Sequence, residues 1–440
     1  MRIATSMIHD AGVSSINRQT ALLLQSQQQV STGRRILTPS DDPVAAARAL
    51  EVSSATSVVS QYQKNHDNAR SVLGIEEAQL SSANDLIGRV RELTVQAGNS
   101  SLADSDRKAL AFEIRSRFEE LTGIANSTDG NGQYVFSGYM GSTKPFGGSV
   151  EDILAGNEIV YQGDEGQRRL QVSATRFLEV SDAGSQVFKT IRNGNGYFTT
   201  DYGAGNTGTG IIDAGSITDP ATWNALPNKN FRLDFTVDTS VNPPVTYYDI
   251  IDVASGNSLL TGGAPAPLPP GGPPAQREYI PGQPIVLESQ GLESPFDLGA
   301  SVLIEGDPAT GDSFGIAPSS SQSVFATLAH LVGVLEGATT ATAGETSKLA
   351  NEIGFALTNL DQAADNISRV RSVIGTRLNE LDSLSSVSED LQLQYQQTLS
   401  NLQDLDYAKA ITDLSRQQTN LQAAQQSFAR VAQLSLFNYL

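Results

Sequence analysis

Apolar residues recur at helical spacing through both ends of the chain, whereas the middle alternates apolar and polar residues as strands do. From Ser319 to Leu440 the sequence contains no proline. Of its 18 prolines, 16 lie between Pro145 and Pro318. Proline removes a helix hydrogen bond and clashes with the preceding turn, so long helices are permitted at the two ends and not in the middle. The pattern predicts a mainly α bundle formed by both chain ends, with a central β-rich insertion.

The N-terminal segment carries a weak heptad pattern. Ile16, Leu23, Val30 and Leu37 lie seven residues apart, with glutamine and serine between them. Seven-residue spacing places these side chains on one stripe of a helix. A helix with so narrow an apolar stripe is marginal in water on its own, so we expect it to need a partner.

The string TPSDDPVAAARAL predicts the start of the next helix. Asp42 is a favourable N-cap, and Pro43 suits the first helical position. The charges of Asp41 and Asp42 also suit the positive end of the helix dipole. A catalytic carboxylate pair is the alternative, but no acid–base partner lies nearby in the sequence. We therefore interpret Ser40, Asp41, Asp42 and Pro43 as a helix-start motif, with the helix continuing to about Gly98.

A further helix is expected from about Asp104 to the turn-rich string NSTDGNG, after which the period changes to two. GQYVFSG is predicted to be a strand, and EIVYQGDEGQRRLQVSA a hairpin that turns at residues 163–166. Four further strands are expected in NFRLDFTVDT, VTYYDIIDV, REYIPGQPIVLE and DLGASVLIEG. Residues 181–318 hold 15 acidic and five basic residues, which indicates a solvated outer surface.

The C-terminal part predicts helices from residue 323 and from about residue 346. Ile374, Leu381, Ser388, Tyr395 and Leu402 form a seven-residue seam that we expect to pack within the subunit. The pattern changes phase between residues 407 and 411, and a second stripe follows. We expect this second stripe to be completed only by the N-terminal stripe and by neighbouring subunits. The predicted assembly interface comprises Ile16, Leu23, Val30, Leu414, Leu421, Phe428, Val431 and Leu434.

These patterns divide the chain into three predicted parts. Residues 1–40 and 407–440 would be the terminal helices of an assembly domain. Residues 41–180 and 320–406 would be the core of the helical bundle, with a β-hairpin. Residues 181–319 would form one or two β-rich outer domains.

Composition narrows the possible functions. The formal net charge of −19 argues against nucleic-acid and anionic-membrane partners. The chain has no cysteine, which excludes disulfides and cysteine-ligated metals. The N-terminus has no continuous apolar region of the kind found in cleaved signal peptides, and no run is long enough to span a membrane. If the protein lies outside the cell, we expect it to leave by a route without signal cleavage.

No pattern of catalytic or ligand-binding residues appears. His9, His66 and His330 are far apart in the sequence and show no metal-ligand spacing. GAGNTG (203–208) fits the GxGxxG string, but it follows no clear strand and opens no helix, so we interpret it as a loop. DGNG at Asp129 has only a fragment of calcium-loop spacing and is interpreted as a turn. We therefore predict a protein that is not an enzyme and has no cofactor or metal.

Three strings resemble the flagellin-like axial proteins of bacterial flagella, in particular hook-associated proteins of the FlgL type. VSTGRRILTPSDDPVAAARAL (30–50) is similar to the N-terminal signature of that subgroup, and IANSTDGNGQYVFSGYMGSTKPF (124–146) to its helix-to-hairpin segment. LQAAQQSFARVAQLSLFNYL (421–440) resembles its C-terminal signature. The resemblance covers roughly residues 1–180 and 320–440, and nothing functional carries over to the insertion.

The resemblance implies an extracellular structural protein that is exported unfolded by the flagellar type III apparatus with a cytoplasmic chaperone. It would join hook to filament at the hook–filament junction, between the preceding hook-associated junction protein and flagellin, as a ring-like layer of identical copies. Flagellin itself, the filament subunit, is the alternative. A third hypothesis is a sugar-binding or enzymatic module carried on the insertion.

Overall fold

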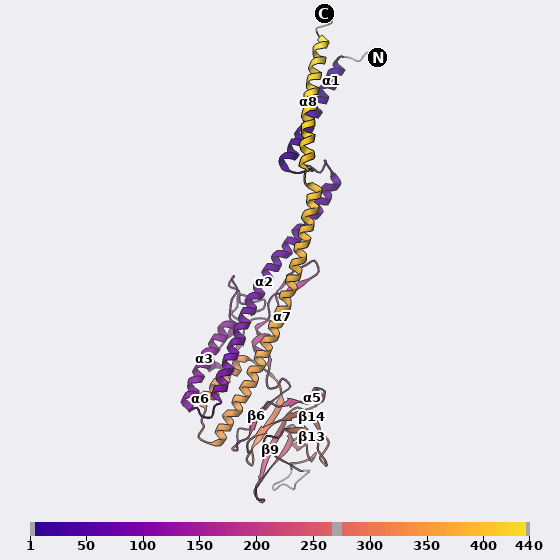
Figure 1. Cartoon of the computed structure of the whole chain (residues 1–440). Coiled ribbons are helices and arrows are strands. Elements are labelled where there is room, and N and C mark those ends of the chain that lie inside the picture. Colours follow the sequence, from indigo (N-terminus) through magenta and orange to yellow (C-terminus); the bar gives the residue numbers. More distant parts are fainter. Residues whose placement is uncertain (1–4, 266–274, 437–440) are drawn as a thin grey trace. The chain divides into compact units, whose positions relative to one another are not determined.

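The computed structural model of the chain describes residues 5–265 and 275–436 (Figure 1). The chain forms two compact units. The first unit comprises Met1–Asn68, Gln171–Arg176 and Glu380–Leu440, and the second comprises Ala69–Leu170 and Phe177–Asn379. Two long helices, α2 (Pro43–Ala97) and α7 (Ala343–Gln403), contribute to both units.

The described part of the first unit is built mainly from helices. α1 (Thr5–Thr32) and α8 (Tyr407–Leu436) lie side by side (Figure 1), and the remainder comes from one end each of α2 and α7. These helices confirm the prediction that the two ends of the chain, which hold only Pro39 and Pro43, form long helices. The predicted change of phase between residues 407 and 411 follows directly after a break in the helix, because α7 ends at Gln403 and α8 begins at Tyr407.

The helical part of the second unit has a continuous apolar core. α3 (Asp104–Ala125) and α6 (Val324–Gly337) pack against each other, and the rings of Phe118 and Phe325 meet edge to face at 5.7 Å. Ser323 caps α6, because its Oγ accepts a hydrogen bond from Ala326 N at 3.0 Å. Two short helical segments complete this part: α4 (Val150–Leu154) and the π-helix η1 (Ser185–Lys189).

The strands that follow α3 correct two predictions. The runs 158–162 and 167–173 do not pair with each other as a hairpin; each pairs with a different partner. The Tyr161 hydroxyl donates to the carbonyl oxygens of Phe136 and Asp164, and Asp164 Oδ1 accepts from Gly166 N, so this loop turns the chain away. GQYVFSG lies in turns, with only an isolated bridge between Tyr134 and Thr128. The observed pairs are β1 (Phe146–Gly147) with β2 (Val160–Tyr161) and β3 (Arg169–Gln171) with β4 (Phe177–Glu179).

The insertion between residues 191 and 322 is rich in β-strands, as predicted. Its largest sheet has the order β11-β10-β9-β16-β6, with β12 paired to β10, and a three-stranded sheet has the order β13-β14-β8. Two pairs of short strands, β15 with β7 and β17 with β5, complete it. The strands are β5 (Ile191–Arg192), β6 (Phe198–Tyr202), β7 (Ile211–Ile212), β8 (Ser216–Ile217), β9 (Phe231–Asp238), β10 (Val245–Asp252), β11 (Asn257–Ser258), β12 (Arg277–Glu278), β13 (Ile285–Glu288), β14 (Asp297–Val302), β15 (Ile304–Glu305), β16 (Ser313–Pro318) and β17 (Ser321–Gln322).

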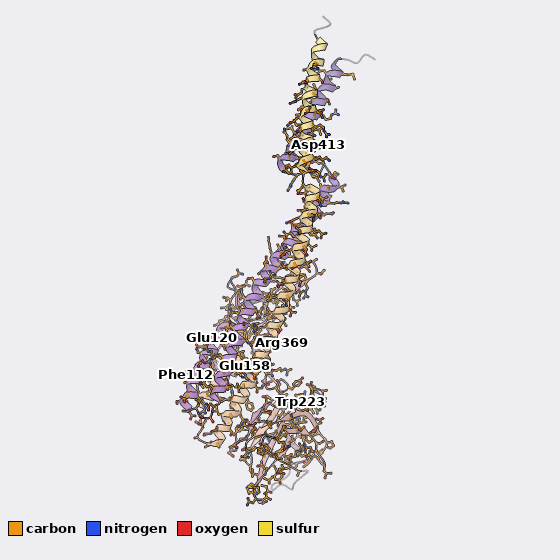
Figure 2. The ribbon with its side chains drawn as sticks, viewed as in Figure 1. Phe112, Glu120, Glu158, Trp223, Arg369 and Asp413 are labelled. Carbon is orange, nitrogen blue, oxygen red and sulfur yellow. The ribbon has the colours of Figure 1, made fainter. Side chains whose placement is uncertain are left out.

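An aromatic cluster forms the core of the insertion. Trp223 (Figure 2) comes from the short helix α5 (Pro220–Ala225) and is 1% exposed. Its ring contacts those of Phe198 and Phe231. Phe235 and Phe314 meet edge to face within the same cluster. The fold class is therefore confirmed as helical ends around a β-rich middle. The predicted three-part division remains a prediction.

Candidate assembly site

The predicted interface residues lie on the two helices at the chain ends. Ile16, Leu23 and Val30 are on α1, and their counterparts on α8 are Leu414, Leu421 and Phe428; all six side chains are half-buried. Val431 and Leu434 also belong to α8, but their side chains lie outside the described residues.

This helix pair has almost no enclosed core. Among the described side chains of α1 and α8, only that of Ser26 is buried. Leu22 and Leu24 on α1 are 46% and 53% exposed, and Ile411 on α8 is 52% exposed. Because stability comes mainly from enclosed apolar area, two helices that fully enclose none of their described stripe side chains contribute little on their own.

A close contact between the two helices lies at Gly12. The Phe428 ring lies over this glycine, and its edge meets the His9 ring with the ring centroids 4.9 Å apart. A Cβ atom at position 12 would lie 2.6 Å from Phe428 Cδ2, well inside van der Waals contact. The absence of a side chain at Gly12 therefore leaves the space that the phenyl ring occupies, and we call this position the notch. The sequence patterns did not single out Gly12.

The connection between α1 and α2 is hydrogen-bonded to the connection between α7 and α8. α1 ends at Thr32, and Gly33 follows in the left-handed region with φ of 71°, as is common at helix C-termini. Leu405 N donates to Gly33 O at 2.9 Å, and Arg35 N donates to Gln403 O at 2.7 Å. These backbone hydrogen bonds link the α1–α2 connection to the α7–α8 connection. We call residues 33–35 and 402–405 the joint.

The side chain of Arg35 fastens the joint. Its Nη2 donates to Leu402 O at 2.7 Å, a carbonyl in the last turn of α7 that has no partner within the helix. Its Nη1 lies 3.3 Å from Asp42 Oδ2. A cation at the C-terminal end of a helix is also favoured by the helix dipole. Arg35 thus connects the end of α7 to the start of α2.

The helix-start motif completes this region. Asp42 Oδ1 accepts from Ala45 N at 3.0 Å, and Pro43 is the first residue of α2. This hydrogen bond is the main reason why the pKa of Asp42 is lowered, with Arg35 adding to the effect. Asp41 Oδ2 accepts from Thr38 N at 2.9 Å and from a second backbone N–H, and these bonds lower the pKa of Asp41. The Ser40 hydroxyl pairs with the Thr38 hydroxyl at 2.8 Å. All of these contacts are structural.

The other candidate sites from the sequence also have structural partners. The GAGNTG loop surrounds Asp312, whose Oδ1 accepts from Thr207 N at 2.8 Å and whose Oδ2 accepts from Gly208 N at 3.0 Å. The loop thus binds a carboxylate of the chain itself. Asp129 Oδ1 accepts from Asn131 N and Gln133 N, so DGNG is a turn.

The three histidines each have a different neighbour. His66 Nε2 is 2.7 Å from Val172 O, His9 packs on Phe428, and His330 lies 3.8 Å from a carboxylate of Glu352. The described residues contain no group of three or more acidic or histidine side chains that could hold a metal ion. No described helix is long and apolar enough to cross a membrane.

Comparison with known proteins assigns the chain to a family. Residues 3–140 match the bacterial flagellin N-terminal helical region, and residues 357–440 match the bacterial flagellin C-terminal helical region. The chain is 26% identical to flagellar hook-associated protein 3 of Salmonella typhimurium over 99% of both chains. The chain also resembles the crystal structure of flagellar hook-associated protein 3 from Legionella pneumophila, with a TM-score of 0.67 and 30% sequence identity. The match covers 80% of this chain and 98% of the Legionella chain. The chain belongs to the FlgL family of flagellar hook-associated proteins.

Other matches fit this membership. Xanthomonas campestris FlgL has a TM-score of 0.65 and 27% identity, and it covers 79% of this chain and 99% of its own. Similarity to flagellins is partial: Salmonella berta flagellin is 28% identical over 49% of this chain and 42% of its own length. The suggested resemblance is therefore confirmed, and the FlgL subgroup is favoured over flagellin. In this FlgL-family chain, the string STGRRILTPSDDP supplies residues 33–35 of the joint and the start of α2.

Proposed function

We propose that the protein is a structural subunit of the hook–filament junction of the bacterial flagellum, where it joins hook to filament through axial packing of α1 and α8. The observation that carries the proposal is the similarity to hook-associated protein 3 over 99% of both chains, because flagellins match only part of the chain. Family relatives are structural flagellar proteins, which also argues against an enzyme.

The terminal helix pair supplies the assembly surface. Its stripe residues are half-buried within one chain, so neighbouring copies could cover the remaining apolar area. Burying the remaining exposed part of a stripe leucine contributes at most roughly 1 kcal/mol, and the contribution recurs at each stripe position. In an assembly of identical copies the same contact repeats around the ring, so weak single contacts add up.

The partners follow from this position. The preceding hook-associated junction protein would lie on the hook side and flagellin on the filament side, with copies of this chain forming the layer between them. Before assembly the chain would cross the flagellar type III export apparatus with the help of a chaperone. Its location would then be extracellular, reached without signal-peptide cleavage.

Deletion of the gene tests the role. Cells that lack the gene should make hooks and export flagellin into the medium, yet carry no filaments. The wild-type gene on a plasmid should restore the filaments. Normal filaments on deleted cells would refute the junction role. If instead the purified chain polymerised into long filaments alone, it would be a flagellin.

A pair of variants tests the assembly surface itself. Leu421→Asp places a charge on the half-buried stripe of α8, whereas Gln422→Asp makes the same change at an exposed position of the same helix. We expect the first variant to be exported but to leave hooks without filaments, and the second to support swimming. Equal motility of the two strains would contradict packing through this stripe, even if the deletion phenotype supports the junction role.

A further inference from the structure

We propose that Glu76 is a proton-dependent latch: its carboxyl group is neutral while residues 179–182 are docked against α2 and α7, and loss of its proton releases this segment. Residues 179–182 lead from β4 towards β5, where the β-rich insertion begins. The latch therefore controls how firmly the base of the insertion is held within the second unit. This role is independent of the terminal helices and of the junction function.

Glu76 is placed where an ionised carboxylate is poorly satisfied. Its side chain projects from α2 and is 0% exposed. Oε1 accepts a hydrogen bond from Asp182 N at 3.1 Å. Oε2 is buried and has no hydrogen-bond partner among the described residues. A buried charge without full hydrogen bonding is costly, whereas a neutral carboxyl group in the same place costs much less.

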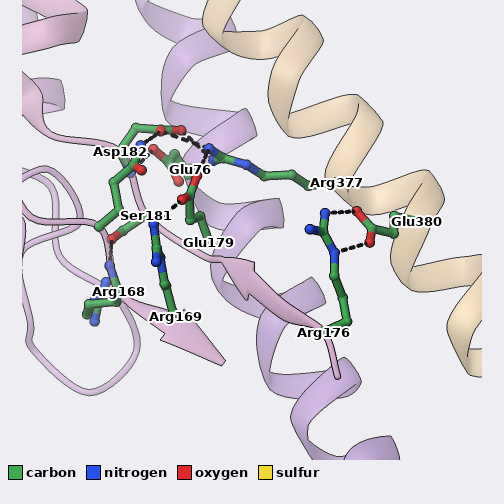
Figure 3. A network of polar contacts seen from close by, with 10 residues as sticks. Glu76, Arg168, Arg169, Arg176, Glu179, Ser181, Asp182, Arg377 and Glu380 are labelled. Carbon is green, nitrogen blue, oxygen red and sulfur yellow. Dashed lines mark hydrogen bonds and ion pairs between the residues drawn. The ribbon is translucent and has the colours of Figure 1, made fainter. Parts of the chain in front are cut away.

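The charged neighbours do not compensate for this position. The positive charge of Arg377, on α7, acts on Glu76, but its guanidinium group is already shared between the carboxylates of Asp182 and Glu179 (Figure 3). Its Nη1 lies 2.8 Å from Asp182 Oδ2, and its Nη2 lies 3.2 Å from Glu179 Oε2. Arg168, from the chain before β3, has the smallest of the five effects on Glu76; its Nη1 donates to the side chain of Gln133 at 3.1 Å, and its Nε and Nη2 are buried with no hydrogen-bond partner among the described residues.

The electrostatic balance favours the proton. Burial is the largest effect and the negative charge of Asp182 the second, and both raise the pKa of Glu76 well above its ordinary value of 4.5. The hydrogen bond from Asp182 N and the charges of Arg377 and Arg168 act in the opposite direction but are smaller. Because the folded-state pKa exceeds the unfolded one, the docked state binds the proton more tightly. The stability that this group contributes is complete below about pH 4.5 and is lost as pH rises through the folded-state pKa.

Hydrogen exchange on the full chain tests the latch. The wild type is compared with Glu76→Gln, which mimics the neutral carboxyl group, at a series of pH values from 4 to 8. The exchange rates of amides 177–182 are expressed as the ratio of wild type to variant at each pH, which removes the intrinsic pH dependence of exchange. We expect this ratio to rise by up to about tenfold per pH unit in the range where Glu76 ionises in the open state but not in the docked one.

Two further measurements make the result decisive. Glu92→Gln, at an exposed carboxyl group on α2 whose side chain is 70% exposed, is the matched control and should follow the wild type. If Glu76→Gln does not fold, the carboxyl carbon-13 resonance of Glu76 in the wild type replaces it as the readout. A ratio that is flat with pH, or a resonance that titrates near pH 4.5, would overturn the latch.

Discussion

The contact between Gly12 and Phe428 allows a test of the terminal helix pair. For Gly12→Ala, helix propensity predicts a gain in stability, whereas packing against Phe428 predicts a loss. Replacing a helical glycine with alanine stabilises a solvated helix by about 1 kcal/mol. At position 12, however, the new Cβ would lie 2.6 Å from Phe428 Cδ2 and 3.0 Å from Cε2. Relieving that overlap requires the ring to move by roughly 1 Å, and overpacking of this kind typically costs about 1–3 kcal/mol. Gly12→Ala should therefore loosen the pair despite its better helix propensity.

Removing the ring reverses the expectation. Phe428→Ala alone should destabilise the α1–α8 contact by about 2 kcal/mol, half of the usual cost for a fully buried phenylalanine, because this side chain is half-buried. In that background the new methyl group at position 12 no longer meets the ring, so Gly12→Ala should stabilise the pair by about 1 kcal/mol. The coupling between the two substitutions should thus equal the overpacking cost of about 1–3 kcal/mol, and the effect of Gly12→Ala on stability should change sign when Phe428 is removed.

Native-state hydrogen exchange of the α1 and α8 amides gives the opening free energies of the four proteins in this cycle. Gly74→Ala is the control, because a Cβ at this helical position of α2 would meet nothing within 4 Å. It should stabilise its own helix in either background. If the effects of Gly12→Ala and Phe428→Ala add to within about 0.5 kcal/mol, the two residues are not in contact and the pairing of α1 with α8 is wrong.

Two further predictions concern the joint. Arg35→Ala removes the donor to the end of α7 and should speed amide exchange in residues 402–407, whereas Arg34→Ala should not, because the Arg34 side chain is exposed and only its backbone takes part in the joint. In acid, the first turn of α2 should loosen. The lowered pKa of Asp42 means that its capping contribution is present above its ordinary pKa of 3.8 and is lost as pH falls through the folded-state value. Amide exchange at Ala45 between pH 5 and pH 2 should show this loss in the wild type and not in Asp42→Asn, which lacks the titrating group.

The helices were predictable because a single physical signal determines them. The absence of proline and the apolar period of 3.6 gave the limits of α2 and α3 to within a residue or two, and Asp42 with Pro43 gave the starting point of α2. The strands of the insertion followed in the same way from alternation. These are local properties of the chain, and the sequence displays them directly.

Pairing was less predictable than the elements themselves. Two alternating runs around a glycine-containing turn predict a hairpin, but the alternation of one strand contains no information about its partner. Here the interactions of Tyr161 and Asp164 with the loop backbone turned the chain aside, and β2 paired with β1 instead. Glu76 was not singled out for a similar reason, since one glutamate on a long helix is ordinarily solvated. Only the fold brings Asp182 and Arg377 to it.

The joint shows what the fold adds to a motif. The string STGRR was recognisable as a family signature, but its physical role depends on residues about 370 positions away in the sequence. Arg35 contacts Leu402 through its side chain and Gln403 through its backbone, and Leu405 returns a hydrogen bond to Gly33. No periodicity within either segment encodes these contacts.

This arrangement fixes the register between the two chain ends locally. The hydrogen bonds of the joint involve only residues 33–35 and 402–405, so the position of α1 against α8 does not depend on how many residues lie in the insertion. The notch at Gly12 and the ring of Phe428 then lie at a defined distance along the helices from the joint, 21 residues before Gly33 and 23 residues after Leu405, which at 1.5 Å per residue is about 32 Å and 35 Å. Because these two lengths are nearly equal, the ring of Phe428 on α8 lies level with the notch at Gly12 on α1. An insertion in the outer strands should leave this match intact, whereas adding one residue between Gly12 and Gly33 would rotate the notch by about 100° away from the ring.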